Sequence, residues 1–370
     1  MTVRILQWLL CAIGVAASVT AGGAAPGVPV GADMRFAQVT GPTNLEFPQD
    51  HGPHPAFRQE WWYFTGNLDG PGHERFGFEL TFFRVALAPH PQSVGWRAQQ
   101  YFFAHFAITD VPRHVFHVAE RSSRDALGLA GAQGAPLRVW LRDWSLEQTT
   151  TPEGKPVWKL RAADADYRLE LSLEPGPIAL NGDRGYSRKS DDPGSASFYY
   201  SMPRVRASGT LTRGAQHFPV KGLSWLDREW GSGALGTQQT GWDWFALQLE
   251  DGSCLMYYRL RDQADRTDPH SAGTFVAASG ATAALAAHDV QVSVQSHWES
   301  PRGGNYPARW HLASSLEGLE LDVMPVLPDQ ELDVTPRYWE GAVDVRGTRR
   351  GQPVAGRGYV ELVGYARSRE

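Results

Sequence analysis

One stretch of the sequence combines carboxylates with large aromatic residues in a pattern suited to acid–base chemistry. Residues 224–231 read Ser-Trp-Leu-Asp-Arg-Glu-Trp-Gly. Alternate side chains of a β-strand point to opposite faces, so Trp225, Asp227 and Glu229 would share one face. A carboxyl group that aromatic rings shield from water keeps its proton to a higher pH and can act as a general acid. The pattern therefore makes Asp227 a candidate proton donor, with Glu229 beside it.

The same residue types also occur in structural ion pairs, which are the commoner case in a β-protein. Asp227 or Glu229 would then pair with an arginine, and Trp230 would pack in a core. The arginines considered as partners are Arg84, Arg121, Arg124 and Arg228. Both interpretations stay open at the level of the sequence.

Other polar residues are candidates to assist such a site. His105 lies in a strand-like run, where a hydrogen-bonded core histidine is commoner than a catalytic one. Tyr199 and Tyr200 are neighbours on a predicted strand, so at most one of them reaches a given cavity. We retain His105 and Tyr200 as candidate catalytic residues. Glu60 and Glu340 flank tryptophans and fit either a barrel lumen or a cap at a barrel end.

The chain has 14 tryptophans, which is unusually many. Small β-barrels are either filled by side chains or hollow, and periodicity does not tell the two apart. The tryptophans could therefore fill barrel interiors or line a pocket for a long apolar ligand. Those to which this applies are Trp61, Trp62, Trp225, Trp230, Trp242, Trp244 and Trp339.

Motifs for phosphate binding, serine hydrolysis and zinc binding are absent: there is no Walker loop, no Gly-x-Ser-x-Gly and no His-Glu-x-x-His. The pairs His51/His54 and His114/His117 have a spacing that puts them on opposite faces of a strand. We expect neither a metal site nor a cofactor.

The elements that must position these residues are predicted to be short strands. Segments rich in β-branched and aromatic residues recur, and the chain's 39 glycines and 25 prolines suit many turns. In residues 167–173, Leu169, Leu171 and Leu173 share one face, while long helical periodicity is scarce. The 370 residues suffice for two domains. These features predict an all-β fold of sandwiches or barrels.

The N-terminus has the pattern of a secretory signal. A short basic start and an apolar run predict a signal peptide over residues 1–21, followed by a flexible lead-in over 22–40. We expect domains at 41–225 and 226–370, and an exported protein, periplasmic or secreted. Cys254 would then be the only cysteine of the mature chain, so we expect no disulfide within the chain. We expect Cys254 itself to act as a small, buried, apolar residue. No later apolar run is long enough to cross a membrane.

The distribution of charged residues bears on which kinds of molecule the protein can bind. The formal net charge is −5 and no run of lysines and arginines stands out. Nucleic acid is therefore not an expected partner.

Several blocks together resemble the carotenoid 1,2-hydratase/AttH-like family of two-domain, lipocalin-like proteins. The resemblance covers residues 47–365. The matching blocks are residues 60–66, 103–107, 181–187, 225–231, 241–245, 329–332, 338–341 and 358–362. It implies two lipocalin-like antiparallel β-barrels that bind long polyene or other apolar molecules.

The resemblance also implies a chemistry. The family's hydratases add water to an isolated C=C bond without metal or redox cofactor: a carboxylic acid protonates the alkene and water captures the cation. An aromatic wall would steady that cation. Asp227 matches the position of the proposed acid. The family's accompanying His, Trp and Tyr are matched here by Phe198, Tyr200 and Trp225, and Phe198 joins the candidate ligand-binding residues.

These differences, with the predicted signal peptide, favour the AttH-like branch, whose members are associated with transport systems. Three hypotheses follow. The first is an enzyme that hydrates, hydrolyses or isomerises an apolar lipid-like substrate. The second is a lipid-binding carrier that serves an envelope transport system of the ABC type. The third is a structural role with both barrels filled.

Overall fold

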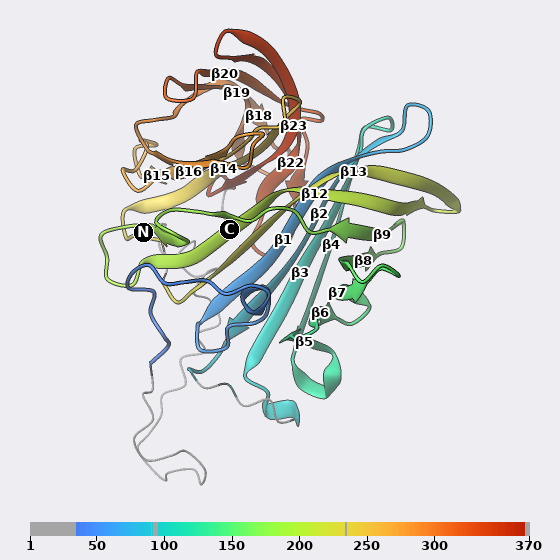
Figure 1. Ribbon diagram of the computed structural model, residues 1–370. Helices are drawn as coiled ribbons and strands as arrows, with labels where there is room; N and C mark the ends of the chain where they lie inside the picture. Colours follow the sequence, from blue (N-terminus) through green and yellow to red (C-terminus); the bar gives the residue numbers. More distant parts are fainter. Residues whose placement is uncertain (1–34, 90, 92–94, 234, 367–370) are drawn as a thin grey trace.

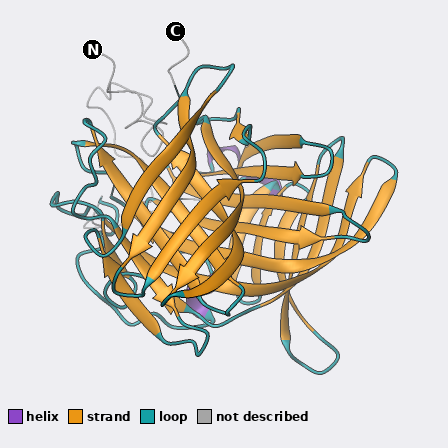
Figure 2. Ribbon diagram, turned by 90° about the horizontal axis from the view of Figure 1, so that it is seen from above, coloured by secondary structure: helices purple, strands orange, loops and turns teal. Residues whose placement is uncertain are grey.

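The computed structural model describes residues 35–89, 91, 95–233 and 235–366, which form two antiparallel β-sheets and almost no helix (Figure 1). One sheet curls into a nearly closed barrel and the other into a half-barrel (Figure 2). The predicted all-β, two-barrel fold is confirmed. The predicted signal peptide lies outside the described residues, as does most of the predicted lead-in.

Sheet A is built from the first thirteen strands in the order β4-β3-β2-β1-β13-β12-β9-β8-β7-β6-β5, with β10 and β11 paired to β12. Its strands are β1 (Gln59–Asp69), β2 (Arg75–Ala86), β3 (Gln100–Asp110), β4 (Val115–Arg124), β5 (Ala130–Gly134), β6 (Leu137–Leu141), β7 (Trp144–Thr150), β8 (Pro156–Ala163), β9 (Tyr167–Glu174), β10 (Ala179–Leu180), β11 (Tyr186–Arg188), β12 (Ala196–Arg213) and β13 (Gln216–Gly231). Among the described residues, three single-turn 3-10 helices lie in or before its connections: η2 (Gln49–His51), η3 (Gly95–Arg97) and η4 (Ala126–Gly128).

Sheet B follows in the order β17-β16-β15-β14-β23-β22-β20-β19-β18, with β21 paired to β22. Its strands are β14 (Gln239–Leu249), β15 (Cys254–Asp262), β16 (Ala272–Val276), β17 (Thr282–Ala286), β18 (Gln291–Glu299), β19 (Asn305–Ser314), β20 (Leu319–Pro325), β21 (Glu331–Leu332), β22 (Tyr338–Arg349) and β23 (Gln352–Val363). The chain passes from one sheet to the other between Gly231 and Gln239, whereas the boundary proposed from the sequence, 225/226, falls within β13.

The central strands of both sheets are buried on both faces. In β1 and β13 of sheet A, Trp62, Phe64 and Trp230 point into the core of sheet A. The residues between them, such as Tyr63 and Trp225, point away from that core into a second apolar layer. Because both faces are covered, these strands appear in the sequence as nearly continuous runs of large residues.

The second layer lies between the two sheets. It joins Tyr63, Tyr199 and Trp225 of sheet A with Trp244 and Tyr359 of sheet B. Phe245 and Trp339 occupy the separate core of sheet B. Cys254 is a free, buried thiol in the layer between the sheets, as expected for a small apolar residue.

Polar contacts also cross this layer. Thr109 Oγ1 donates to Gln330 Oε1 at 2.8 Å, and Asn67 Nδ2 donates to the Gly358 carbonyl oxygen at 3.1 Å. Tyr63 donates its hydroxyl proton to Glu340. Apolar packing and directional bonds together fix one sheet against the other, so a site between them has rigid walls.

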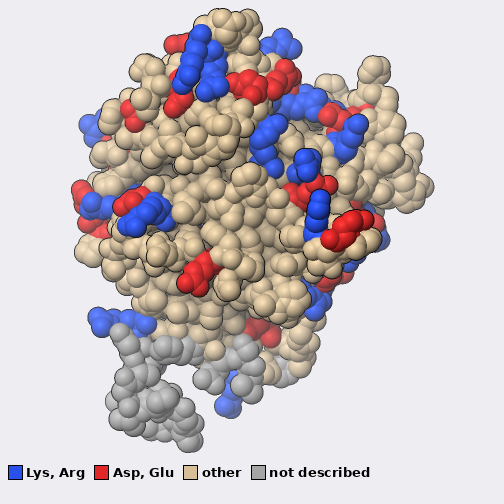
Figure 3. Space-filling model, viewed as in Figure 1, with Lys and Arg blue, Asp and Glu red and all other residues tan. Residues whose placement is uncertain are grey.

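The surface gives two further observations. Acidic and basic side chains are interspersed on the face shown in Figure 3, with no large area of one sign. Within the described ranges, the search for a long apolar helix that could cross a bilayer finds none.

Candidate functional site

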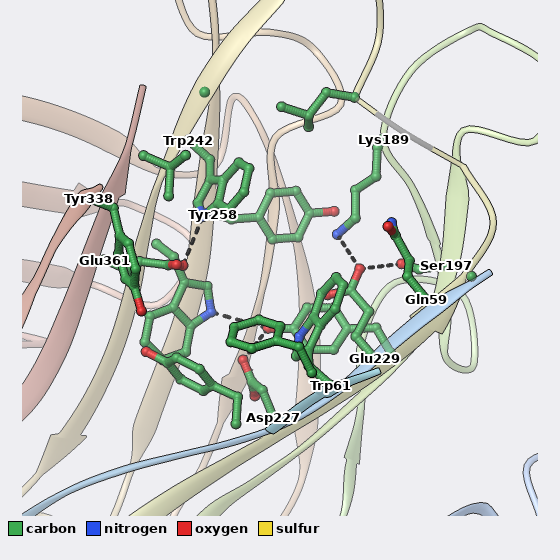
Figure 4. Close-up of a pocket in the computed structure, with 18 of the residues that line it drawn as sticks. Gln59, Trp61, Lys189, Ser197, Asp227, Glu229, Trp242, Tyr258, Tyr338 and Glu361 are labelled. Atoms are coloured by element: carbon green, nitrogen blue, oxygen red, sulfur yellow. Dashed lines mark hydrogen bonds and ion pairs between the residues drawn. The ribbon is translucent and has the colours of Figure 1, made fainter. Parts of the chain in front are cut away.

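A cavity of about 220 Å³ lies between the two sheets (Figure 4). Its walls come from strands of both sheets and from the segments that precede β12, β14 and β22. The lining residues that matter for chemistry are Gln59, Lys189, Ser197, Tyr199, His105, Asp227, Glu229, Tyr258, Tyr338 and Glu361. The cavity is therefore outside both barrel interiors, a location that the sequence had left open.

Asp227 of β13 is buried on the cavity wall and accepts three hydrogen bonds. Ser201 Oγ donates at 2.5 Å and Trp225 Nε1 at 2.7 Å, and the Tyr199 hydroxyl donates to the other carboxyl oxygen. Burial raises the pKa of Asp227 to about 6, the three hydrogen bonds oppose the rise, and Glu229 adds to it. No ion pair to Asp227 forms within the described residues, so this group is free to exchange a proton.

Glu229 lies two residues after Asp227 on the same face of β13, and it forms an ion pair. The Lys189 ammonium is 3.3 Å from its carboxylate, and the Ser197 hydroxyl donates to it. Lys189 Nζ also lies 4.0 Å from the centre of the Tyr258 ring. Glu229 therefore holds Lys189 in the wall, and the ion-pair interpretation applies to Glu229 with a lysine in place of an arginine.

Three of the four arginines proposed as partners are engaged elsewhere. Arg84 and Arg228 both donate to Glu60, which is fully buried near the start of β1. Burial would raise the pKa of Glu60, but the two guanidinium charges hold it well below its ordinary value. Arg121 pairs with Asp143. Arg228 points to the opposite face of β13 from Asp227, as the alternation predicts.

Glu361 of β23 is a second proton-exchanging carboxyl group on the cavity wall. It comes from sheet B, whereas Asp227 comes from sheet A (Figure 4). Trp242 Nε1 donates to it at 2.8 Å. Burial raises the pKa of Glu361 to about 7, the Trp242 bond lowers it, and the charges of Asp227 and Glu229 raise it. At neutral pH this group is present in both protonation states.

His105 and Tyr338 form a third polar corner of the cavity. His105 Nδ1 is 2.9 Å from the Tyr338 hydroxyl, which crosses from sheet B. His105 is 1% exposed, and burial lowers its pKa despite the nearby Glu120 carboxylate. His105 is thus a buried, hydrogen-bonded histidine that also lines the cavity.

The aromatic candidates divide between the cavity and the cores. Trp61, Trp242 and Trp244 line the cavity, and Trp225 lies behind Asp227, with its ring edge-on to Trp244 at 6.3 Å. The remaining candidates are elsewhere: Trp62 and Phe198 pack with the core of sheet A, and Trp339 lies in the core of sheet B. Some of the candidate aromatic residues therefore fill the barrel cores, and others line the cavity, so each of the two interpretations applies to part of them.

Tyr200 does not reach the cavity. Its hydroxyl bonds His51 Nδ1 at 2.7 Å in the core of sheet A. Its neighbour Tyr199 faces the cavity instead, as the opposed faces of a strand require. Within the described part of the chain, no cluster of three or more potential ligands has the geometry of a metal site.

Comparison with known proteins identifies the family to which this chain belongs and solved structures with a similar fold. The AttH-like family model matches residues 38–365, almost the whole described chain. The chain belongs to the AttH-like family. Its fold is similar to that of a putative AttH from Nitrosomonas europaea, with a TM-score of 0.79 and 36% identity over 90% of this chain and 100% of that one.

Fungal enzymes are more distant relatives of this AttH-like chain. Kievitone hydratase of Fusarium solani subsp. phaseoli is 26% identical over 177 residues, 46% of this chain and 49% of that protein. Dehydratase asqC of Emericella nidulans is 26% identical over 181 residues, 46% of this chain and 51% of that protein. The chain thus matches about half the length of these curated relatives. The structure of kievitone hydratase from Nectria haematococca shares the fold, with a TM-score of 0.65 and 16% identity over 90% and 98% of the two chains.

Several cavity residues of this AttH-like chain were not singled out from the sequence. Glu361 stands between Val360 and Leu362, which both face the core of sheet B. That alternation is visible in the sequence and puts Glu361 on the opposite face with Tyr359. Lys189 precedes β12 in an irregular connection, and no periodic signal could have placed it.

Proposed function

We propose that this protein is a cofactor-free hydro-lyase that adds water to, or removes it from, an apolar small molecule bound between the two sheets. The observation that carries the proposal is the pair Asp227 and Glu361. Asp227, which is buried, and Glu361, which is partly buried, stand on opposite sheets, line one aromatic cavity, and have pKa values raised to about 6 and about 7. The hydratase and dehydratase relatives support the same reaction class.

The different surroundings of the two groups assign their roles. Asp227 receives three hydrogen bonds, which favour its carboxylate form, whereas Glu361 receives one, from Trp242. Two carboxyl groups with different proton affinities in one site can serve as acid and base. In hydration, Glu361 is the acid and Asp227 is the base. In dehydration the roles reverse, and Asp227 protonates the leaving hydroxyl group. The sequence had instead made Asp227 the acid that protonates the alkene in hydration.

The hydration step balances without a cofactor. The Glu361 proton forms a C–H bond with one alkene carbon as the π bond breaks, which leaves a cation on the other carbon. Water forms a C–O bond there and transfers a proton to Asp227. Trp61, Trp242 and Trp244 line the cavity, and their rings would offer cation–π attraction to the cation.

The test uses the purified protein in ¹⁸O-labelled water with two probes, kievitone and the isoprenoid geranylgeraniol. Mass spectrometry should detect addition of one labelled water to at least one probe by the wild type. D227N and E361Q should each lower kcat by about 10²–10⁴-fold, the range for loss of a general acid or base. No labelled product from either probe, with the probe recovered unchanged in complex with the protein, would contradict the hydro-lyase and favour a carrier.

Export of the protein is a second part of the proposal, whereas service to an envelope transport system belongs to the alternative, a lipid carrier. Fractionation of cells that express the full chain tests export. Protein found in the periplasm or the medium, shortened near residue 21, supports export. Full-length protein in the cytoplasm contradicts it.

A further inference from the structure

The cavity contains a largely buried ion pair that the proposed reaction does not use. Lys189, Glu229 and Ser197 all line the cavity. Figure 4 shows Lys189 and Ser197 on one side of the cavity and Glu361 on the other. A molecule whose reacting bond lies beside Glu361 can therefore place another of its groups beside Lys189.

The structure holds Lys189 firmly in the cavity wall. Its backbone N–H donates to the Ser195 carbonyl oxygen at 2.8 Å, and its own carbonyl oxygen accepts from Gln239 Nε2 at 2.6 Å. Its side chain is 16% exposed, with Nζ 3.3 Å from Glu229 Oε1 and 4.0 Å from the centre of the Tyr258 ring. Burial would lower the pKa of Lys189, but Glu229 and Tyr258 raise it above its ordinary value, so the ammonium group stays charged.

The ion pair has hydrogen-bonding capacity to spare. An ammonium group has three N–H donors, and Glu229 and Tyr258 face only two of them on Lys189. Ser197 and Lys189 both approach Oε1 of Glu229, and within the described residues no hydrogen bond to Oε2 is formed. The pair can therefore give one N–H and accept one proton donor from a bound molecule.

The charges of the site select the kind of group that fits. Lys189 and Glu229 balance each other, and Asp227 on the same wall adds a negative charge when it is ionised. A second anion beside Lys189 would be repelled by these two carboxylates. A neutral hydroxyl group can accept from Lys189 and donate to Glu229 at the same time, whereas a carbonyl or an ether oxygen can only accept.

We propose that the ion pair of Lys189 and Glu229 binds a neutral hydroxyl group of the substrate, which is thus an unsaturated alcohol or phenol with an otherwise apolar body. The hydroxyl oxygen accepts from Lys189 Nζ, and its proton is donated to Glu229 Oε2. This inference rests on the proposed function, because it specifies the substrate of the same cavity. A purely structural ion pair, which only ties the segment before β12 to β13, would not distinguish one polar group from another.

The test compares three ligands that share one unsaturated chain and differ at the polar end: geraniol, geranyl methyl ether and geranic acid. Quenching of tryptophan fluorescence at pH 7.5 reports their dissociation constants without turnover, because Trp61, Trp242 and Trp244 line the cavity. Geraniol should bind about tenfold more tightly than the ether, which has no proton to donate, and more tightly than the acid, which is repelled. Equal affinities for all three ligands, or tightest binding of geranic acid, overturns the inference.

Two variants test the residues themselves. K189M keeps the length of the side chain but removes its donors, so it should weaken geraniol binding about tenfold. E229Q leaves the charge of Lys189 unbalanced, so geranic acid should gain about tenfold or more in affinity relative to geraniol, and this variant decides the matter if K189M does not fold. K159M is the matched control, because Lys159 lies in β8 outside the cavity lining, and its affinities should equal those of the wild type. Wild-type geraniol affinity in folded K189M, or an unchanged ratio in E229Q, contradicts the proposed hydroxyl site.

These binding measurements separate failure of the inference from failure of the hydro-lyase. The expected affinities, without addition of labelled water to geraniol, support the hydroxyl site and place the failure in the proposed reaction. Labelled water added equally fast to geraniol and to geranyl methyl ether, with equal affinities for both, contradicts the hydroxyl site and leaves the hydro-lyase standing.

Discussion

Replacing Asp227 by Asn should remove the activity and make the protein lose less stability as the pH rises from acidic to neutral. Asp227 has an ordinary pKa of 3.8 and a folded-state pKa of about 6. Because the folded value is raised, the stabilisation from the protonated carboxyl group is complete below pH 3.8 and is lost as the pH rises through about 6. Asn cannot ionise, so the variant does not suffer this loss.

The magnitude follows from the pKa difference. One pKa unit corresponds to about 1.4 kcal/mol, so the full loss for Asp227 is about 3 kcal/mol. About 2 kcal/mol of it falls between pH 4.5 and pH 7.5. Asn also loses hydrogen bonds, since it has one acceptor oxygen for the three donors Tyr199, Ser201 and Trp225. That loss is nearly the same at both pH values and cancels in the comparison.

The measurement is the free energy of unfolding in urea at pH 4.5 and pH 7.5 for the wild type and D227N. The difference, D227N minus wild type, should increase by about 2 kcal/mol at the higher pH. D183N is the control, because the Asp183 side chain is 64% exposed and its stability difference should not change with pH. A difference for D227N that is the same at both pH values would refute the reasoning that burial sets the proton affinity of this group.

Five further substitutions test the rest of the site and the ion pairs outside it. W242F removes the N–H that donates to Glu361, so the pKa of Glu361 should rise above about 7 and the alkaline limb of the kcat/KM–pH profile should move to higher pH. Y199F removes a hydrogen-bond donor to Asp227 and should lower kcat. Y200F changes the opposite face of the strand, so it should leave kcat unchanged and lower the free energy of unfolding in urea by about 1 kcal/mol. E60Q leaves Arg84 and Arg228 without their buried carboxylate and should destabilise the protein by about 3–5 kcal/mol, measured by urea unfolding. E174Q, which breaks an exposed pair with Arg206, should change stability by less than about 1 kcal/mol.

Local alternation was enough to predict part of the site. The placement of Trp225, Asp227 and Glu229 on one face of a strand, and of Arg228 and Trp230 on the other, agrees with the structure. This succeeded because the extra residue of the register shift next to Asp227 lies in β12, between Met202 and Val205, whereas β13 itself stays regular and pairs with β1 without a shift. A regular strand keeps the period of two that the prediction assumed.

Packing between the sheets could not be predicted in the same way. Whether a tryptophan fills a barrel or lines the cavity depends on which face meets the other sheet, and that is set by tertiary contacts. Trp61 and Trp62 are adjacent in sequence, yet the first lines the cavity and the second packs in the core of sheet A. The sequence likewise could not show which carboxylate binds the arginines. Glu60 binds both Arg84 and Arg228, which come from different strands.

Because these strands are buried on both faces, ligand selectivity and protein stability can be engineered at separate positions. In the central parts of β1, β13, β14 and β23, alternate positions face the layer between the sheets, while the positions between them belong to a barrel core. A mutagenesis library confined to Trp61, Trp242 and Trp244 would reshape the ligand space and leave both cores intact. A single-residue deletion before Asp227 in β13 would do the opposite, because it would exchange the two faces and turn Arg228 toward the ligand.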